Sequence, residues 1–262
     1  MSLILQISDT HFGTERPAVV QALARLAEQL QPRLVVLSGD ITQRARPEQF
    51  RAASDFMKGL RLPLLVVPGN HDIPLFNLWA RLTQPYAGHR AAFGQELEPV
   101  FRSSDLMVLG VNTTRAHRHQ NGEVSAQQVA RVARRLARAT PAQLRVVVVH
   151  QPIDVQRPQD VPDRLIGHAA AQAAWASAGA DLVMGGHIHL PYVMPLPGLA
   201  RPMWAVQAGT AVSHRVRPGV PNSVNVVRWN ASQGTCAVEQ WDHVATEDAF
   251  EQVRVTRLQP AR

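Results

Sequence analysis

The sequence predicts an α/β fold in which two β-sheets stack on each other and helices cover their outer faces. Over most of the 262 residues, short apolar runs alternate with segments of helical periodicity, as expected for parallel strands joined by crossover helices. Polar side chains follow directly after five of these runs. Beyond Pro191 the apolar residues alternate with a period of two, which indicates antiparallel strands and argues against a simple doubly wound sheet.

The N-terminal part of the chain predicts the order β-α-β-α-β. Its strands are predicted at the apolar runs beginning at Leu3, Leu34–Leu37 and Leu64–Val67. One helix is predicted to open at Glu15-Arg16-Pro17 and the next at Pro47, because proline is favoured in the first turn of a helix. Gly59 lies near the end of the second helix. This order indicates a parallel sheet with right-handed crossovers.

The periodicity is weaker between Ile73 and Phe101. Phe76, Trp79 and Leu82 predict a short helix, and a second helical stretch is expected to reach Phe101. We expect residues 74–121 to form a cap beside the functional site. The helical spacing of Trp79 favours packing over stacking on a nucleotide base, and we expect the same of Tyr86.

The later elements are predicted from apolar runs and from a helix-capping motif. A strand is expected over Asp105–Val111, and Ser125-Ala126-Gln127-Gln128 fits a capping box that opens a helix. Further strands are expected over Arg145–Val149 and Asp181–Met184, with a helix around Ala169–Ala178 between them. Antiparallel strands are expected within residues 203–257, over Met203–Ala208, Val224–Trp229, Cys236–Trp241 and Gln252–Arg257. With no linker or repeat, residues 1–262 are expected to form a single domain.

Composition limits the class of protein. The net charge of +7 and the pI of about 11.0 would attract phosphorylated substrates, nucleic acids or acidic lipid surfaces. The positive charge comes almost wholly from arginine, since Lys58 is the only lysine, and a GC-rich genome would explain this bias equally well. Cys236 is alone, which excludes an internal disulfide and a thiolate metal cluster. Without a run of about 18 apolar residues or a leader, we expect a cytoplasmic protein.

Groups able to bind metal ions or move protons gather where the predicted strands end. Five of the eleven histidines fall there, together with carboxylates and an amide. They are Asp9 and His11, Asp40, Asn70, His71 and Asp72, His150, and His187 and His189. Because the ends of parallel strands lie along one edge of a sheet, these side chains are expected to converge.

The mixture of nitrogen and oxygen donors without sulfur suits Mn²⁺, Fe²⁺ or Fe³⁺, Co²⁺ or Zn²⁺. There are too many donors for one ion, since a single catalytic metal commonly uses about three protein ligands. Two ions are therefore expected, and a carboxylate can bridge them at the separation of about 3.5–4 Å typical of two-metal sites.

The ordered set of motifs resembles the calcineurin-like metallophosphoesterase superfamily. The motifs are Asp9-x-His11, Gly39-Asp40, Gly69-Asn70-His71-Asp72, His150 and Gly186-His187-x-His189, and the resemblance spans residues 3–190. Within the superfamily the chain is most similar to class III cyclic-nucleotide phosphodiesterases and their glycerophosphodiesterase relatives. Gly209-Thr210 and the turn Ser213-His214-Arg215 also resemble that group. The resemblance implies a four-layer α-β-β-α sandwich of two mixed β-sheets flanked by helices, the metallophosphoesterase fold.

The resemblance also implies the role of each residue. Asp9, His11 and His189 would bind the first metal ion. Asn70, His150 and His187 would bind the second. Asp40 and a hydroxide would bridge the two ions, and the hydroxide would attack phosphorus. His71 would protonate the leaving oxygen or hydrogen-bond the phosphate, while Asp72 would hold the loop rather than touch metal.

Substrate-binding candidates are less sharply defined. Protein serine/threonine phosphatases of the superfamily carry an aspartate and an arginine three and four residues after the bridging aspartate, and here Gln43 and Arg44 stand at those positions. The missing carboxylate argues against a phosphoprotein phosphatase. Arg44 is a candidate for facing the substrate, and a structural role at the surface is an equal alternative. His117 and His119 are further candidates, on a loop that could equally be an exposed basic loop.

Several functions remain compatible with these motifs. The leading hypothesis is a dinuclear-metal phosphodiesterase that cleaves a small phosphodiester such as a cyclic nucleotide. A nucleotide-sugar lipid pyrophosphohydrolase or a nuclease could use the same site, although nothing after Pro191 is aromatic enough to stack bases. A non-catalytic scaffold is disfavoured because every expected ligand is present. The sequence leaves the choice of metals and the formation of a homo-oligomer open.

Overall fold

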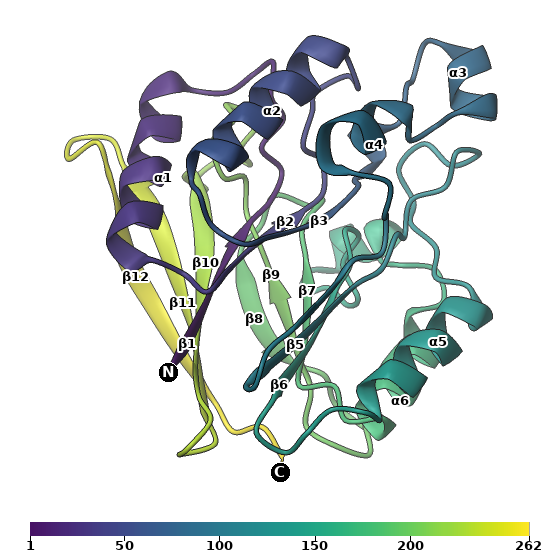
Figure 1. Cartoon of the computed structure of the whole chain (residues 1–262), viewed down its shortest axis with the longest axis vertical. Coiled ribbons are helices and arrows are strands. Elements are labelled where there is room, and N and C mark those ends of the chain that lie inside the picture. The colour runs from purple at the N-terminus through teal and green to yellow at the C-terminus, as the bar shows by residue number, and fades with distance from the viewer. Residues whose placement is uncertain (262) are drawn as a thin grey trace.

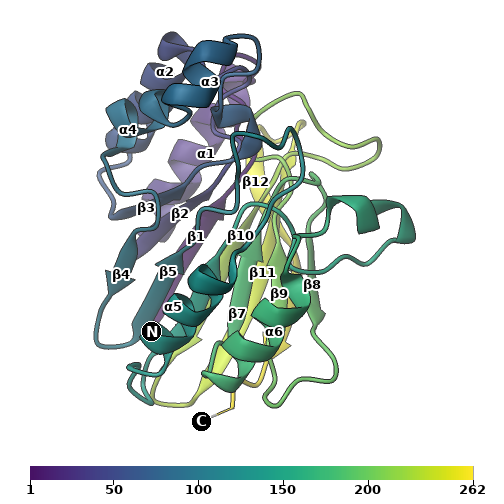
Figure 2. The same cartoon turned by 90° about the vertical axis from the view of Figure 1, so that its right-hand side faces the viewer.

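The computed structural model describes residues 1–261 and contains two mixed six-stranded sheets stacked face to face (Figures 1 and 2). The first sheet contains β1 (Ser2–Ile7), β2 (Leu34–Ser38), β3 (Leu64–Val67), β10 (Ser223–Asn230), β11 (Thr235–Val244) and β12 (Ala249–Leu258). The second contains β4 (Val100–Arg102), β5 (Leu106–Gly110), β6 (Leu144–Val148), β7 (Leu182–Gly185), β8 (Tyr192–Pro195) and β9 (Trp204–Gln207). The strand orders are β12-β11-β10-β1-β2-β3 and β4-β5-β6-β7-β9-β8.

Helices cover the outer face of each sheet. The helices are α1 (Pro17–Leu30), α2 (Pro47–Gly59), α3 (Leu78–Thr83), α4 (Ala87–Phe93), α5 (Ala126–Leu136) and α6 (His168–Ser177), with short 3₁₀ turns at Asn70–Asp72 and Pro158–Asp163. Buried residues of α1 and α2 pack against the first sheet, and those of α5 and α6 pack against the second. The predicted four-layer α-β-β-α architecture is confirmed. No helix within residues 1–261 is both long and apolar enough to cross a bilayer.

A third cluster of buried side chains fills the space between the two sheets. Ile4 and Val36 from the first sheet meet Val108, Val146 and Val206 from the second in this layer. These side chains are at most 1% exposed, and the alternating pattern of each strand directs them inward. The packing therefore fixes one sheet against the other.

The helix boundaries follow from the residues that cap them. Pro17 and Pro47 stand in the first turns of α1 and α2, as predicted. At the start of α5, the backbone amide of Gln128 donates to Ser125 Oγ at 3.2 Å, and the backbone amide of Ser125 donates to Gln128 Oε1 at 3.0 Å. This reciprocal pair confirms the predicted capping box.

The pairing of the late strands differs in part from the prediction. β10, β11 and β12 are antiparallel, as expected, and β10 joins the first sheet beside β1. β9, within the predicted strand Met203–Ala208, instead pairs in parallel with β7 and antiparallel with β8, a strand that was not predicted. A hydrophobic period of two indicates that one face of a strand is buried, but it does not indicate whether the neighbouring strands are parallel or antiparallel.

The segment 74–121 also departs from prediction. α4 ends at Phe93, and Val100–Arg102 form strand β4 instead of continuing a helix to Phe101. Trp79, which is predicted to pack, is 71% exposed, and the other large apolar side chains of α3 are exposed as well. This helix lies at the periphery of the molecule in Figure 1. The buried side of α3 is occupied by Arg81, whose guanidinium donates to the carbonyls of Pro74 (3.1 Å) and Arg118 (2.6 Å).

The burial of His89 in α4 predicts that the folding stability of the protein depends on pH. Its ring is fully buried, neither nitrogen has a hydrogen-bond partner among the described residues, and burial lowers the pKa of His89 from 6.5 to about 4. The unfolded chain therefore binds a proton between these pH values while the folded chain does not. Folding stability is lost as pH falls from 6.5 toward 4, by up to about 3 kcal/mol.

Substitution of His89 by leucine is expected to remove this contribution. Urea denaturation at pH 7.5 and pH 5 should show a smaller loss of unfolding free energy on acidification in the variant than in the parent protein. Equal losses in both proteins would contradict the assignment to His89.

Candidate metal centre

The loops that follow five strands meet at one end of the stacked sheets. Asp9 and His11 follow β1, Asp40 follows β2, and Asn70 and His71 follow β3 of the first sheet. His150 follows β6, and His187 and His189 follow β7 of the second sheet. The site thus lies across the junction between the two sheets, at the ends of their parallel strands.

The backbone of these loops is unusual. Five of the predicted site residues have positive φ: Asp9 (52°), His11 (41°), Asp40 (48°), His187 (73°) and His189 (55°). Left-handed conformations are costly for residues with a side chain and persist where surrounding structure enforces them. Two glycines allow the close approach of the loops, because a Cβ on Gly69 would lie 2.0 Å from the amide nitrogen of Asp40, and one on Gly186 would lie 2.0 Å from Ser8 Oγ.

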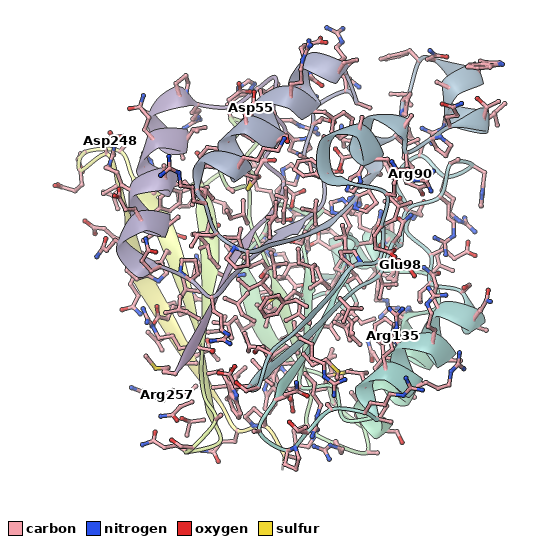
Figure 3. The ribbon with its side chains drawn as sticks, in the orientation of Figure 1. Asp55, Arg90, Glu98, Arg135, Asp248 and Arg257 are labelled. Atoms are coloured by element: carbon pink, nitrogen blue, oxygen red, sulfur yellow. The ribbon has the colours of Figure 1, made fainter. Side chains whose placement is uncertain are left out.

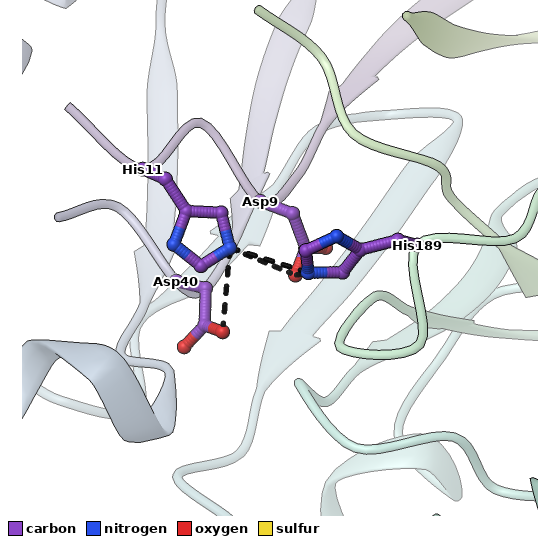
Figure 4. A group of neighbouring side chains, drawn as sticks. All are labelled: Asp9, His11, Asp40 and His189. Carbon is purple, nitrogen blue, oxygen red and sulfur yellow. Dashed lines mark hydrogen bonds and ion pairs between the residues drawn. The ribbon is translucent and has the colours of Figure 1, made fainter. Parts of the chain in front are cut away.

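One group of donors consists of Asp9, His11, Asp40 and His189 (Figure 4). Nε2 of His11 lies 3.2 Å from Nε2 of His189 and 3.7 Å from Oδ2 of Asp40. Nε2 of His189 lies 3.3 Å from Oδ1 of Asp9. These donor atoms enclose a common space of the size that a single ion needs.

A second group adjoins the first through Asp40. It contains Asp40, His150 and His187. Nε2 of His150 lies 3.2 Å from Oδ1 of Asp40 and 3.2 Å from Oδ1 of Asn70. Asp40 therefore turns Oδ2 toward the first group and Oδ1 toward the second, as a bridging carboxylate would.

The hydrogen bonds of the histidines leave lone pairs facing this shared space. Nδ1 of His150 lies 2.9 Å from the carbonyl of Ser38, and Nδ1 of His189 lies 2.5 Å from the carbonyl of Arg215. A carbonyl can only accept, so these Nδ1 atoms carry hydrogens and, in the neutral rings, each Nε2 is left with its lone pair. Nε2 of His187 lies 3.6 Å from Asp163, while its buried Nδ1 has no hydrogen-bond partner among residues 1–261. Lone pairs that converge in this way suit a metal cation.

The electrostatics of the site favour the metal-binding forms of Asp40 and His11, but they favour the protonated form of His150. Burial alone would raise the pKa of Asp40, but His150 and His71 hold it well below its ordinary value. Burial lowers the pKa of His11 to about 3, so this ring is neutral. Burial would also lower the pKa of His150, yet the charge of Asp40 raises it to about 9. A proton on His150 would have to leave when a cation binds there.

Asp72 supports the site without facing either group. Its carboxylate accepts hydrogen bonds from the backbone amides of Ile41 (3.1 Å), Thr42 (2.8 Å) and Gly69 (2.8 Å). It therefore ties the loop after β3 to the loop carrying Asp40, which agrees with the structural role predicted for it. Burial raises the pKa of Asp72 to about 6.

His71 lies beside the two groups. Its backbone amide donates to Oδ1 of Asp40 at 2.8 Å, and its ring meets that of His11 edge-on with centroids 4.9 Å apart. Nδ1 of His71 lies 3.0 Å from the carbonyl of Gln43, so Nδ1 carries a hydrogen and Nε2 is the atom available to other groups.

The predicted substrate-binding residues are not all placed alike. Arg44 and His119 line a small hollow together with Asn70 and His71. The guanidinium carbon of Arg44 also lies 5.5 Å from the centroid of the Phe76 ring. His117 is exposed and does not belong to the lining of this hollow.

Two residues near the candidate ligands were not predicted to act there. Asp163, in the 3₁₀ turn at Pro158–Asp163, faces His187, and Arg215 reaches His11 and His71 from the loop between β9 and β10. The family resemblance includes the turn Ser213-His214-Arg215 but implies no role for it. Asp163 has no local sequence signal, because its partner lies on a distant loop.

Comparison with known proteins agrees with this architecture. Residues 2–191 match the calcineurin-like phosphoesterase family. A glycerophosphodiester phosphodiesterase of Enterobacter lignolyticus is 40% identical over a stretch covering 27% of this chain and 29% of that protein. A cAMP/cGMP dual specificity phosphodiesterase of Mycobacterium tuberculosis is 27% identical over 71% of this chain and 61% of that protein. The matched region spans less than two thirds of either relative.

A solved structure of a dimetal phosphatase from Danio rerio is similar over 99% of both chains, with a TM-score of 0.67 at 13% identity. At this identity the likeness concerns the fold. The sequence match itself covers most of the chain and includes every strand that carries a candidate ligand. The protein therefore belongs to the calcineurin-like phosphoesterase family.

Proposed function

We propose that this protein is a dinuclear-metal phosphodiesterase acting on a small phosphodiester, such as a cyclic nucleotide or a glycerophosphodiester. The observation that carries the proposal is Asp40, whose two carboxylate oxygens face two separate groups of histidine and oxygen donors. The substrate class is supported by the two sequence relatives, which are named as phosphodiesterases. The cytoplasmic location, the single domain and the cap formed by residues 74–121 stay predictions.

In this proposal Asp9, His11 and His189 hold one ion, Asn70, His150 and His187 hold the other, and Asp40 contacts both. Such a pair of ions, when bound, supplies an activated water nucleophile and stabilises charge on the phosphate oxygens. The donor set suits Mn²⁺, iron, Zn²⁺ or Co²⁺. The role of the protein is to hold these donors rigidly, through the buried loops and carbonyl contacts described above.

His71 is proposed to deliver a proton to the leaving oxygen of the diester. Its Nδ1 is engaged with the carbonyl of Gln43, so the transferable proton would sit on Nε2. Arg44 and His119 are proposed to contact the rest of the substrate, since both line the hollow that contains His71. We propose no contact for His117.

A panel of substrates with Mn²⁺ added to the protein tests the proposed activity. The panel contains bis-p-nitrophenyl phosphate, cyclic AMP, a glycerophosphodiester, single-stranded DNA and UDP-diacylglucosamine. Preferred turnover of a small diester is the expected result. Preference for DNA or for the lipid diphosphate would assign the site to a nuclease or a pyrophosphohydrolase, and no turnover with two metals bound would favour a scaffold.

Asp163 provides a test that does not depend on the substrate. In the proposed site its carboxylate orients His187, and loss of such a partner typically weakens metal affinity by about 10- to 100-fold. Asp163→Asn is therefore expected to bind the second ion more weakly while the first ion is retained. Calorimetric titration of the metal-free protein measures both steps.

Asp55→Asn is the matched control, because it makes the same change of charge at an exposed position on α2 (Figure 3). Its metal affinity should equal that of the parent protein. Equal affinity for both ions in Asp163→Asn would show that Asp163 does not orient a ligand.

A further inference from the structure

The loop between β9 and β10 holds Arg215 in a fixed position beside the candidate metal centre. Its carbonyl accepts hydrogen bonds from Thr210 Oγ1 (2.8 Å) and from His189 Nδ1 (2.5 Å). Its backbone amide donates to Ser213 Oγ at 2.9 Å. The same residue that orients a candidate metal ligand through its backbone thus presents its side chain to the site.

The guanidinium of Arg215 points at the residues proposed to act on the substrate. Nη1 lies 3.0 Å from Gln43 Oε1, 3.2 Å from His71 Nε2 and 3.4 Å from His11 Nδ1. The opposite nitrogen of His11 faces Asp9, Asp40 and His189. A single imidazole ring therefore separates the guanidinium from the proposed position of the first metal ion.

The positive charge of Arg215 has no paired carboxylate. Among residues 1–261, no acidic oxygen lies within the 4.0 Å of an ion pair from this guanidinium, although the side chain is half-buried. Arg217, two residues further on, has its charge matched by Asp160 at 2.6 Å. A partly desolvated cation without a counter-ion favours the arrival of an anion.

The chemistry of the group indicates which anion. A guanidinium is permanently charged and can only donate, and its planar array of N–H groups matches the oxygens of a phosphate. Its neighbours are the amide oxygen of Gln43 and a ring nitrogen of His71, and neither of them is an anion. A phosphate oxygen at this place would replace these weak contacts with a charge-assisted hydrogen bond, which is typically about twice as strong.

We propose that Arg215 binds a non-bridging oxygen of the phosphoryl group undergoing hydrolysis. The inference rests on the proposed phosphodiesterase function and adds to it a positively charged contact supplied by the protein itself. Arg215 would stabilise the negative charge of the phosphate in both the substrate and the product. It would act on the side where His71 is proposed to protonate the leaving oxygen.

The test compares Arg215→Gln and Arg215→Lys in protein loaded with Mn²⁺. Binding of inorganic phosphate is measured by calorimetry, metal content by elemental analysis, and kcat and KM with bis-p-nitrophenyl phosphate. Arg215→Gln should keep both ions but bind phosphate about 10- to 100-fold more weakly, as expected for a hydrogen bond to a charged group. Arg215→Lys should recover part of the affinity, because it keeps the charge and loses the planar geometry.

Arg257→Gln is the control for the change in net charge. Arg257 is exposed on β12, and the strand register aligns it through Ala237 and Arg228 with Leu3, at the opposite end of β1 from Asp9 (Figure 3). This variant should bind phosphate like the parent protein.

Different outcomes separate the two proposals. Unchanged phosphate affinity in an Arg215→Gln protein that holds two ions would overturn the role of Arg215 while leaving the phosphodiesterase function intact. A fall in kcat with unchanged phosphate affinity would also overturn it, because Arg215 would then act by positioning His71 and not by binding phosphate. A parent protein that binds neither metal nor phosphate would overturn both proposals.

Discussion

Asp40→Ala is expected to retain at most one metal ion and to lose phosphodiester hydrolysis by at least about 10³-fold, since a bound metal contributes several kcal/mol to stabilising the transition state. The reason is the position of its carboxylate, which turns one oxygen toward His11 and the other toward His150. Removal of this side chain takes a donor from both groups at once. Elemental analysis of protein reconstituted with Mn²⁺, together with turnover of bis-p-nitrophenyl phosphate, measures the effect.

Asp40→Asn refines the same experiment. It keeps the volume and one oxygen of the side chain but removes the negative charge, so it tests whether the bridge requires a carboxylate. Thermal unfolding monitored by circular dichroism checks that both variants are folded. Retention of two ions by a folded Asp40→Ala protein would refute the shared-carboxylate arrangement.

His71→Ala is expected to keep both metal ions but to lower turnover by about 10²- to 10⁴-fold for a diester with a poor leaving group, the usual contribution of a positioned general acid. His71 lies outside both donor groups, and only its backbone amide contacts Asp40. Turnover of a glycerophosphodiester should therefore fall much further than that of bis-p-nitrophenyl phosphate, whose leaving group needs little protonation.

The comparison of the two substrates is what identifies proton transfer. A loss of equal size for both would indicate that His71 binds the phosphate instead of protonating the leaving oxygen. His168→Ala, at the start of α6, is a suitable histidine control and should leave both rates unchanged. If His71→Ala hydrolysed the diester with a poor leaving group at the rate of the parent protein, His71 would not be the general acid.

The elements that build the core could be predicted because local patterns determine them. Runs such as Leu34–Leu37 and Val146–Val149 are buried on both faces, and proline or a capping box marks the start of α1, α2 and α5. Strand direction could not be predicted in the same way. β9 is parallel to β7 only because a hairpin through β8 brings the chain back beside it.

Trp79 shows a different limit. Its helical spacing with apolar neighbours predicted burial, yet the side of α3 that faces the protein carries Arg81, whose guanidinium finds two carbonyl acceptors. An arginine can occupy an interior position when its donors are satisfied. Periodicity alone does not reveal those partners.

The candidate ligands were predictable because each follows a strand directly. The polar residue at the end of an apolar run is visible in the sequence, and parallel strands place such residues at one edge. Arg215 and Asp163 lack this signal. Arg215 contacts His11 across 204 positions of sequence, through a turn whose hydrogen bonds are known only from the structure.

The donors of the site are divided between the two sheets, since Asp9, Asp40 and Asn70 belong to loops of one, and His150 and His187 to loops of the other. Metal–donor distances tolerate deviations of only about 0.2 Å. The affinity for metal ions is therefore expected to depend on the relative position of the two sheets. Core substitutions far from the loops, at Val108 for example, should loosen ion binding before they unfold the chain.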